Sequence, residues 1–477
     1  MENEINMERE YGEFKVNGSK GRVNKIVLMT LPEEGQFVNW TTPNHFKPKA
    51  VKYMPLGILS LASNLPKDTY DIKLLDASSH GWSIEETIQR IESEKPDVLG
   101  ITSVDRKVWA LNRILRETSA SYKAVGGPHV THYGDSALKN GADAVFIGPL
   151  AENEFRKAVD EVSNGKPPKG KIYCTTNIND INFPQRKFLD VNFYFPKEFV
   201  LFRAENRLPM FSSVGCPQQC TFCNVQTKKP QLKNASAVVD EMEYLYTIGC
   251  RSVHILDDNF NVIPNHLDRV STEMNKRGFN SEWSGRGQVR MKDYTTLEKL
   301  TNYGFKRIHV GFEHFDSDVL KWFRKPETIQ DIDRFCEAMN RSNIDMLGYF
   351  IIGTPLEMQR DKMDYVEKLP EKIREHNIKH PFFNVLYPEP DTEYYRQLVS
   401  QGVYDRDVWT EYMANPVPDF EIKYPYGEAR RNEVMAQVQW LIEEFKTKPT
   451  ESVEAMDANT LTPRGVEEKK VGHIRQE

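Results

Sequence analysis

Three cysteines lie close together near the middle of the 477-residue chain. Cys216, Cys220 and Cys223 form the pattern C-x3-C-x2-C, and Phe222 directly precedes the last of them. Three thiolates at this spacing can bind three irons of a [4Fe–4S] cluster, which leaves the fourth iron open to a substrate or cofactor. A zinc site completed by a distant histidine is one alternative, and three buried cysteines without a ligand are another. The spacing favours the iron–sulfur cluster over both.

The composition limits the class of protein that carries this loop. Hydrophobic residues make up 39% of the chain and charged residues 28%, which is typical of globular domains. The net charge of −6 without a long basic run argues against a nucleic-acid partner, because phosphate contacts require clustered Lys and Arg. Six cysteines are too few for a disulfide scaffold. The polar arm at 1–20 does not resemble a signal peptide and no apolar stretch is long enough for a membrane span, so we expect a cytoplasmic protein.

Short apolar runs in the first third of the chain alternate with helix-length segments. Each run fits a buried parallel strand, and the runs cover residues 25–31, 72–75, 98–102, 123–125 and 144–147. This alternation predicts a doubly wound, Rossmann-like α/β domain over residues 21–165. Ligands of such sheets bind beyond the carboxyl ends of the strands. In this chain those ends carry Thr102, Ser103, Gly126, Gly127, Pro128, His129, Gly148 and Pro149.

A second alternation of strand and helix patterns follows. Residues 166–205 carry scattered Pro, Asn and Asp with weak periodicity, which predicts an extended linker. About six strand–helix units then occupy residues 206–400 and predict a partial or full parallel βα barrel with its chemistry at the carboxyl ends of the strands. We expect a small helical region at 401–446 and a disordered tail at 447–477, which is rich in Lys, Glu and Pro.

The cysteine loop resembles the signature of the radical S-adenosylmethionine (radical SAM) superfamily, which has this spacing and this aromatic residue. In that family the open iron binds the amino and carboxylate groups of SAM. An electron from the cluster then cleaves SAM to a 5′-deoxyadenosyl radical. The resemblance implies cluster ligation by Cys216, Cys220 and Cys223. It also implies a small-molecule substrate and an external electron donor of the flavodoxin or ferredoxin type.

The resemblance continues along the predicted barrel. Asp257 and Asp258 end its second strand, where the family places an acidic contact to the SAM amino group. Val310–Glu313 is similar to the Gly-x-Glu element of the fourth strand, and the segment around Gly353 is similar to the fifth-strand segment that packs against adenine. The implied SAM site comprises Phe222, Asp257, Asp258, Arg286, Gln288, Glu313 and Gly353. Taken singly, the aspartate pair could be a helix N-cap, and Glu313 could be a surface carboxylate.

The N-terminal half resembles the cobalamin-binding domain of the B12-type radical SAM subfamily. Tyr53–Ala62 is similar to its P-x-G-x-x-x-L-A helix start, and the glycine turn after the fourth strand would let the backbone approach a corrin. The implied cobalamin contacts are Thr102, Ser103, Gly126, Gly127, Pro128 and Gly148. Two motifs depart from the family pattern. The segment around His80 does not fit the D-x-H-x-x-G motif that supplies an axial histidine, and residues 148–154 replace the usual G-E-G-E turn.

Several other residues allow two interpretations. Cys174, Cys250 and Cys336 are unclustered, and Cys336 falls on the apolar face of its predicted helix, which favours core packing. Trp409 and Tyr412 either line a substrate pocket or anchor the C-terminal helix. We expect His80 and His129 to be loop histidines rather than ligands.

Three functional hypotheses follow. The first is cobalamin-dependent C-methylation of an unactivated carbon in a small metabolite or natural-product intermediate. The second, motivated by the altered turn at 148–154, keeps the radical without the corrin and performs a rearrangement, dehydration, epimerisation or ring formation on a small metabolite or lipid. The third is a non-catalytic iron–sulfur or zinc protein. We adopt the first hypothesis, and the resemblance then implies a radical SAM methyltransferase.

Overall fold

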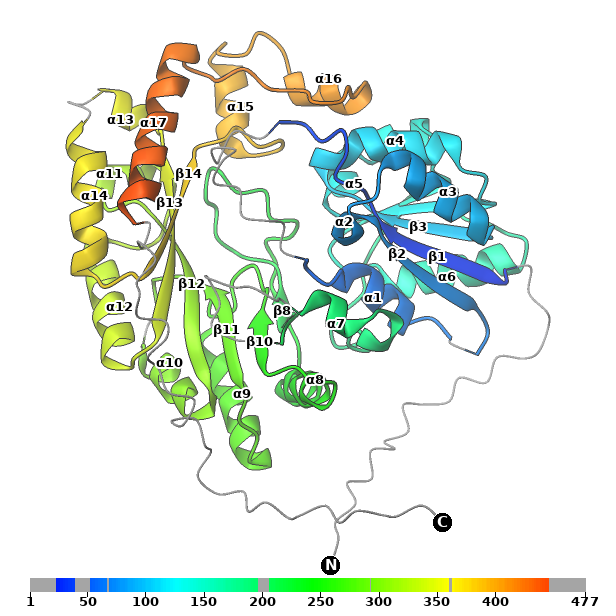
Figure 1. Cartoon of the computed structure of the whole chain (residues 1–477), viewed down its shortest axis with the longest axis horizontal. Coiled ribbons are helices and arrows are strands. Elements are labelled where there is room, and N and C mark those ends of the chain that lie inside the picture. The colour runs from blue at the N-terminus through cyan, green and yellow to red at the C-terminus, as the bar shows by residue number, and fades with distance from the viewer. Residues whose placement is uncertain are drawn as a thin grey trace, which may run out of the picture.

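The chain folds into two lobes, each built on a parallel sheet (Figure 1). The computed structural model describes residues 23–38, 52–66, 68–195, 206–291, 293–359 and 363–445. The predicted polar arm at 1–20 and the predicted disordered tail at 447–477 lie outside the described residues. Within the described ranges, no helix is both long enough and apolar enough to cross a membrane.

The first lobe contains a six-stranded sheet in which all neighbours are parallel. Its strands are β1 (Lys25–Thr30), β2 (Asp71–Asp76), β3 (Val98–Thr102), β4 (Tyr122–Gly126), β5 (Ala144–Ile147) and β6 (Gly170–Tyr173). Their order is β2-β1-β3-β4-β5-β6, which confirms the predicted doubly wound fold. Ligands of such sheets bind at the carboxyl ends of the strands.

Helices cover both faces of this sheet. They are α1 (Leu56–Ser63), α2 (Ala77–His80), α3 (Ile84–Glu94), α4 (Val108–Glu117), α5 (Pro128–Lys139) and α6 (Glu152–Ser163). Ile26 and Leu28 of β1 point to the face covered by α1 and α6, whereas Val27 and Met29 point to the face covered by α3, α4 and α5. Burial on both faces explains why the strands are continuous apolar runs in the sequence.

The segment between the lobes differs from the prediction. Residues 166–205 are predicted to be a linker, yet β6 lies within them and extends the first sheet beside β5. In this four-residue edge strand, Lys171 and Tyr173 are exposed, so no apolar run marks it in the sequence. The same segment contains α7 (Val191–Tyr194). The buried Tyr194 hydroxyl donates to Asp76 Oδ2 (2.7 Å), which fixes α7 to the first lobe.

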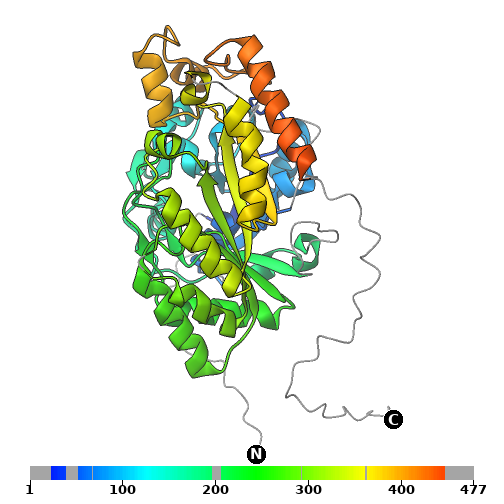
Figure 2. The same ribbon diagram turned by 90° about the vertical axis from the view of Figure 1, so that its left-hand side faces the viewer.

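The second lobe is a partial barrel of six parallel strands in sequential order. The strands are β7 (Arg207–Met210), β10 (Ser252–Ile255), β11 (Glu282–Gly287), β12 (Phe305–Glu313), β13 (Asp345–Ile352) and β14 (His380–Val385). The helices of its outer face are α8 (Ala235–Thr247), α9 (Pro264–Arg277), α10 (Thr295–Leu300), α11 (Ser317–Trp322), α12 (Ile329–Arg341), α13 (Pro355–Gln359) and α14 (Met363–Glu375). Figure 2 shows this helical layer in front of the sheet.

The helical C-terminal region joins the two lobes. It comprises α15 (Glu393–Ser400), α16 (Val408–Ala414) and α17 (Glu428–Glu444). Trp409 is fully buried, and its Nε1 donates to the carbonyl oxygen of Pro388 (2.7 Å). The rings of Trp409 and Tyr412 lie 4.9 Å and 5.9 Å from the ring of Phe37, which follows β1. Of the two interpretations, anchoring is therefore the one that the contacts support.

Candidate active site

A short antiparallel pair, β8 (Ser213–Val214) and β9 (Gln231–Leu232), closes the base of the cysteine loop. Gly215 begins the loop with a φ of +89°, and a Cβ there would lie 2.7 Å from the Thr227 side chain. Only glycine combines that backbone conformation with such close contact. The Gly215 N–H donates to Asp258 Oδ2 (2.8 Å), and the Cys216 N–H donates to the Thr227 carbonyl oxygen (3.1 Å).

The middle of the loop is held by the barrel. The Thr221 N–H donates to the Phe323 carbonyl oxygen (3.1 Å), and the Thr221 carbonyl oxygen accepts from the Tyr394 N–H (2.8 Å). The ring of Phe222 meets the ring of Phe323 edge to face with their centroids 5.0 Å apart. The aromatic residue of the cysteine motif therefore packs the loop onto the barrel through its ring.

The three cysteines of the loop are free thiols. Burial raises the pKa of Cys220 to about 12 and also raises the pKa of Cys223. Among the described residues, no group of three or more His, Cys, Asp or Glu side chains is arranged to hold a single metal ion. Each thiolate of a [4Fe–4S] site binds a different iron, so the three sulfur atoms need not meet around one point. The cysteine loop, which is held by hydrogen bonds to the barrel, therefore offers three free thiols. This is the number and the type of ligand that such a [4Fe–4S] cluster requires.

The two aspartates that follow β10 have different roles. Asp257 is fully buried, and its carboxylate accepts from the Ser212 N–H and the Ser213 hydroxyl, both at 2.7 Å. Burial raises the pKa of this carboxyl group. Asp258 is exposed toward the loop. Asp257 therefore fixes the strand that leads into the cysteine loop, which leaves Asp258 as the member of the pair that can meet a ligand.

Side-chain amides connect the third barrel strand to the cysteine loop. Gln288 Oε1 accepts from Gln218 Nε2 (3.0 Å) and from Asn259 Nδ2 (2.9 Å). Asn259 Nδ2 also lies 3.8 Å from the Cys216 sulfur, and its Oδ1 is buried without a hydrogen-bond partner. The predicted Gln288 is thus part of the loop's support, whereas the predicted Arg286 is exposed. Sequence reasoning missed Asn259, although it directly follows the aspartate pair.

Glu313 ends β12 in a left-handed backbone conformation, with a φ of +61°. Its buried carboxylate folds over Gly311, where a Cβ would lie only 2.1 Å from Glu313 Oε1. The ammonium of Lys325 lies 3.5 Å from this carboxylate and 3.0 Å from that of Glu327. Lys325 also donates to the Gly311 carbonyl oxygen (2.8 Å). Glu313 is therefore buried and paired with Lys325, not a surface carboxylate, and no spacing in the sequence reveals this partner.

Gly353 follows β13 with a φ of +94°, and a Cβ there would lie 2.8 Å from Val434. Its N–H donates to Glu357 Oε2 (2.6 Å), and the Thr354 N–H donates to the same oxygen. Glu357 Oε1 lies 3.3 Å from His314 Nε2. The turn predicted to approach adenine is thus shaped by a buried carboxylate and by α17.

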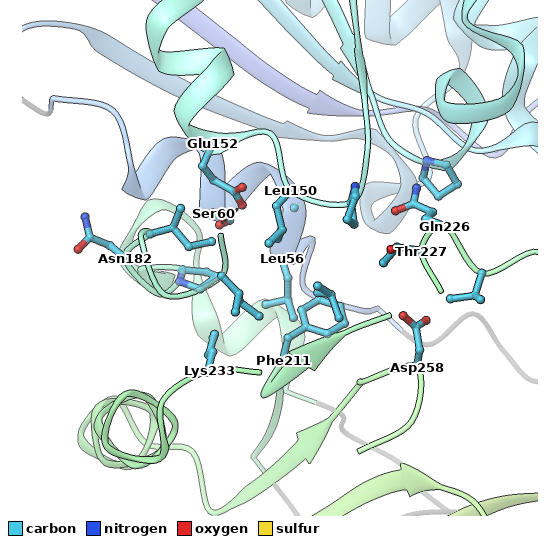
Figure 3. A pocket seen from close by; sticks show the side chains of 18 of the residues that line it. Leu56, Ser60, Leu150, Glu152, Asn182, Phe211, Gln226, Thr227, Lys233 and Asp258 are labelled. Carbon is cyan, nitrogen blue, oxygen red and sulfur yellow. Dashed lines mark hydrogen bonds between the residues drawn. The ribbon is translucent and has the colours of Figure 1, made fainter. Parts of the chain in front are cut away.

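Two adjoining cavities lie between the lobes, with volumes of about 370 Å³ and about 280 Å³. The larger is lined from the first lobe by Leu56 and Leu150 and from the second by Phe211, Thr227 and Asp258 (Figure 3). The smaller extends over the carboxyl ends of β3, β4 and β5. Residues that line both are Gly57, Pro128, Pro149, Glu152, Phe211 and Gln226. The carboxyl ends of the first sheet and of the barrel strands β7 and β10 therefore open onto one continuous space.

Most of the predicted cobalamin contacts meet at this space. The smaller cavity is lined by Thr102, Gly126, Gly127, Pro128 and Gly148. Ser103 is fully buried behind them, and its hydroxyl donates to the Gly126 carbonyl oxygen (2.9 Å). A Cβ on Gly57 or Gly126 would meet no atom within 4 Å, so these glycines leave open the room that a broad ligand requires. The glycines leave room for a broad ligand, and Ser103 supports the glycine turn from behind.

The two candidate histidines lie away from the cavities. His80 Nδ1 is 2.8 Å from the Asp76 carbonyl oxygen, and its ring stacks 4.4 Å from that of Phe193. His129 Nδ1 is 2.9 Å from Asp105 Oδ1. Neither lines the cavities described above. The expectation that both are loop histidines is wrong, because His80 is the last residue of α2 and His129 is a buried residue in the first turn of α5.

The fold and the site define a class: a doubly wound domain facing a partial barrel that carries a C-x3-C-x2-C loop. The model of the Radical SAM superfamily matches residues 210–369, and the model of the B12 binding domain matches residues 50–156. The chain thus carries both a B12-binding domain and a radical SAM domain.

Known proteins are similar to most of the chain. Bacteriochlorophyllide d C-12(1)-methyltransferase of Chlorobaculum tepidum is 24% identical over 356 residues, which cover 72% of this chain and 74% of the relative. The structure of the radical SAM methyltransferase TsrM from Kitasatospora setae, with cobalamin and a [4Fe-4S] cluster bound, is 16% identical with a TM-score of 0.59 and covers 81% of this chain and 79% of its own. OxsB with aqua-cobalamin and SAM bound is 15% identical with a TM-score of 0.61, over 89% of this chain and 67% of its own. These structures share the fold.

Proposed function

We propose that this chain is a cobalamin-dependent radical SAM methyltransferase that methylates an unactivated carbon of a small molecule. The single observation that carries the proposal is the continuous space between the lobes. The glycine turns of the B12-binding domain line one side, and Asp258 and the end of the cysteine loop line the other. Groups held on the two walls can therefore act on one substrate without leaving the protein.

The residues of the chain divide the work of holding the cofactors. Cys216, Cys220 and Cys223 would hold the [4Fe–4S] cluster, and Asp258 and Glu313 would contact SAM. The glycine turn at Gly126 and Gly127 and the residues that share its cavity would hold cobalamin. When bound, the cluster supplies the electron for SAM cleavage, and cobalamin carries the methyl group. The apolar wall formed by Leu56, Leu150 and Phe211 would keep water away from the reacting groups.

The substrate and the reductant are proposed at the level of chemical class. We infer a small metabolite or natural-product intermediate, because the two cavities between the lobes, of about 370 Å³ and about 280 Å³, have the size of a small-molecule site. Cleavage of SAM to a radical requires an external electron, and a cytoplasmic flavodoxin- or ferredoxin-type protein is the expected donor.

The test measures corrin content and reaction products together. Protein purified without oxygen, with its cluster reconstituted and hydroxocobalamin added, should retain near-stoichiometric corrin after gel filtration. With substrate, it should form both 5′-deoxyadenosine and S-adenosylhomocysteine, because one SAM supplies the radical and another supplies the methyl group. Formation of 5′-deoxyadenosine alone by corrin-free protein would replace methylation with a rearrangement, elimination or ring formation.

The cysteine loop provides the matched control. Cys220→Ala should lose iron and all SAM cleavage, whereas Cys174→Ala, outside the loop, should keep both. A Cys220→Ala variant that keeps its iron–sulfur spectrum and still cleaves SAM would rule out the radical SAM assignment.

A further inference from the structure

Glu152 places a buried carboxylate on the wall between the two cavities. It is the first residue of α6, its side chain is only 6% exposed, and it lines both cavities. The Ser60 hydroxyl donates to Glu152 Oε1 (2.6 Å), as Figure 3 shows from the cavity side. Glu152 Oε2 has no hydrogen-bond partner. In the described part of the chain, no Lys, Arg or His forms an ion pair with it.

An unpaired carboxylate oxygen in such a place is unfavourable without a ligand. Burial raises the pKa of Glu152, which reflects the cost of charge in this environment. A buried polar atom that lacks a hydrogen bond typically costs about 1–3 kcal/mol. The apolar members of the cavity wall, among them Leu56, Leu150 and Pro149, offer this oxygen no side-chain donor. A ligand that carries its own donor would remove this cost.

We propose that Glu152 recognises a primary amide on the rim of the corrin, and that this contact selects amidated cobalamin over corrins that carry a carboxylate at the same position. A primary amide suits the site in either protonation state, since it offers N–H donors to a carboxylate and a carbonyl acceptor to a carboxylic acid. A carboxylate at that point would face the ionised form of Glu152 with like charge. The inference rests on the proposed cobalamin binding and adds the residue that recognises an amide on the rim of the corrin.

This role accounts for the unusual turn after β5. The usual G-E-G-E sequence is replaced at residues 148–154, and the turn is formed by Gly148 and Pro149. Gly148 still has a φ of +133° beside Cys174, so the backbone keeps a conformation that favours glycine. The chain then enters α6 so that its first residue lies against the cavity. Glu152 thus supplies a carboxylate at the wall although the motif itself is altered.

The test measures cobalamin affinity of the full chain by absorbance titration, without any turnover. Glu152→Leu should weaken hydroxocobalamin binding by roughly 10-fold or more, because a hydrogen bond to a charged group is typically worth about 1.5–3 kcal/mol. Glu152→Gln, which keeps an acceptor oxygen, should lose less. Glu161→Leu, on the same helix but lining neither cavity, should bind like the unchanged chain. Urea unfolding of each variant confirms that the fold is retained.

A charge exchange makes the test specific to the amide. Cobalamin derivatives in which one rim amide is hydrolysed to a carboxylic acid should include one that the unchanged chain binds poorly and that Glu152→Gln binds well. Equal affinity of Glu152→Leu and the unchanged chain for cobalamin would overturn this inference and leave the proposed function intact. Absence of cobalamin binding by the unchanged chain would instead overturn the cobalamin-dependent function.

Discussion

One ammonium group lies between two buried carboxylates beneath the cysteine loop. Lys325 and Glu327 are buried with Glu313, and the electrostatic field of all three reaches Cys220. Removing one member of a buried ion pair is strongly destabilising, because the remaining charge loses its partner but stays out of water. The cationic member of this group is therefore needed for stability as well as for the position of Glu313.

Lys325→Met should lower the free energy of unfolding by about 3 kcal/mol, since two carboxylates lose their counter-ion in a buried place. Urea unfolding at neutral pH measures this loss. The double variant Lys325→Met/Glu327→Gln should recover part of it because one orphaned charge is removed as well. Lys321→Met, whose side chain is 80% exposed, is the control and should change stability little. Equal losses in the single and double variants would contradict the charge argument.

At the scale of elements, the cysteine loop depends on the conformation at its entrance. Gly215 combines a positive φ with a steric limit, because Thr227 and the Lys229 carbonyl oxygen lie where a side chain would start. A side chain would thus displace the β8–β9 end of the loop, and with it the first cysteine. Backbone strain alone, without this steric contact, would not displace the loop.

Gly215→Ala should reduce the iron content of the reconstituted protein by at least half, measured by iron and sulfide analysis. Gly249→Ala separates the two causes, because Gly249 has a similar φ of +93° but an added Cβ would meet no atom within 4 Å. Both variants should lose about 1 kcal/mol of stability through backbone strain. Only the first should lose iron, and equal iron content in the two would show that the steric contact is unimportant.

The elements themselves were largely predictable, and the exceptions have physical reasons. The predicted strand runs lie within or overlap β1 to β5, because strands buried on both faces are marked by continuous apolar residues. β6 escaped detection because an exposed edge strand has no such run. Asp391 has a φ of +59°, the left-handed conformation that is typical of glycine, so its residue type did not reveal the turn geometry.

The site was predictable only in part. The cysteine spacing and the strand-end glycines are local patterns, so they indicated the loop and most of the cavity wall. The roles of Asp257 and Ser103 depend on which neighbour reaches them, which no spacing reveals. Lys325 and Glu152 became visible as site residues only because the fold brings a distant partner or a cavity to them.

At the scale of the whole molecule, a histidine–aspartate pair links the lobes. His132 Nδ1 of α5 lies 2.7 Å from Asp391 Oδ2, which precedes α15. The hydrogen bond between them raises the pKa of His132 and lowers that of Asp391. The contribution of His132 is present below its ordinary pKa of about 6.5 and is lost as pH rises through its raised value. That of Asp391 is present above about 3.9 and is lost as pH falls through its lowered value.

Asp391→Asn should therefore reduce stability most between about pH 4 and pH 6.5, and less at about pH 8.5, where His132 is neutral. Because Asp391 is half-exposed, the largest loss should stay below about 1 kcal/mol. Asparagine tolerates a positive φ, so the backbone is unchanged. Asp419→Asn, at an exposed position with a φ of +54°, should show no such pH dependence in parallel unfolding curves. A loss that is the same at all pH values would exclude the pair with His132 as its source and would point instead to the ion pair of Asp391 with Arg396 (3.1 Å).

The two lobes differ in fold but share a hydrophobic core. The face of the first sheet covered by α1 and α6 belongs to the same contiguous cluster as the interior of the barrel and the aromatic residues around Trp409. Parts of a protein that share one contiguous hydrophobic core unfold together, even where they differ in fold. The lobes should consequently melt in one heat-absorption peak. A cut between them would leave each half with an uncovered apolar surface, prone to aggregate instead of surviving as an independent domain.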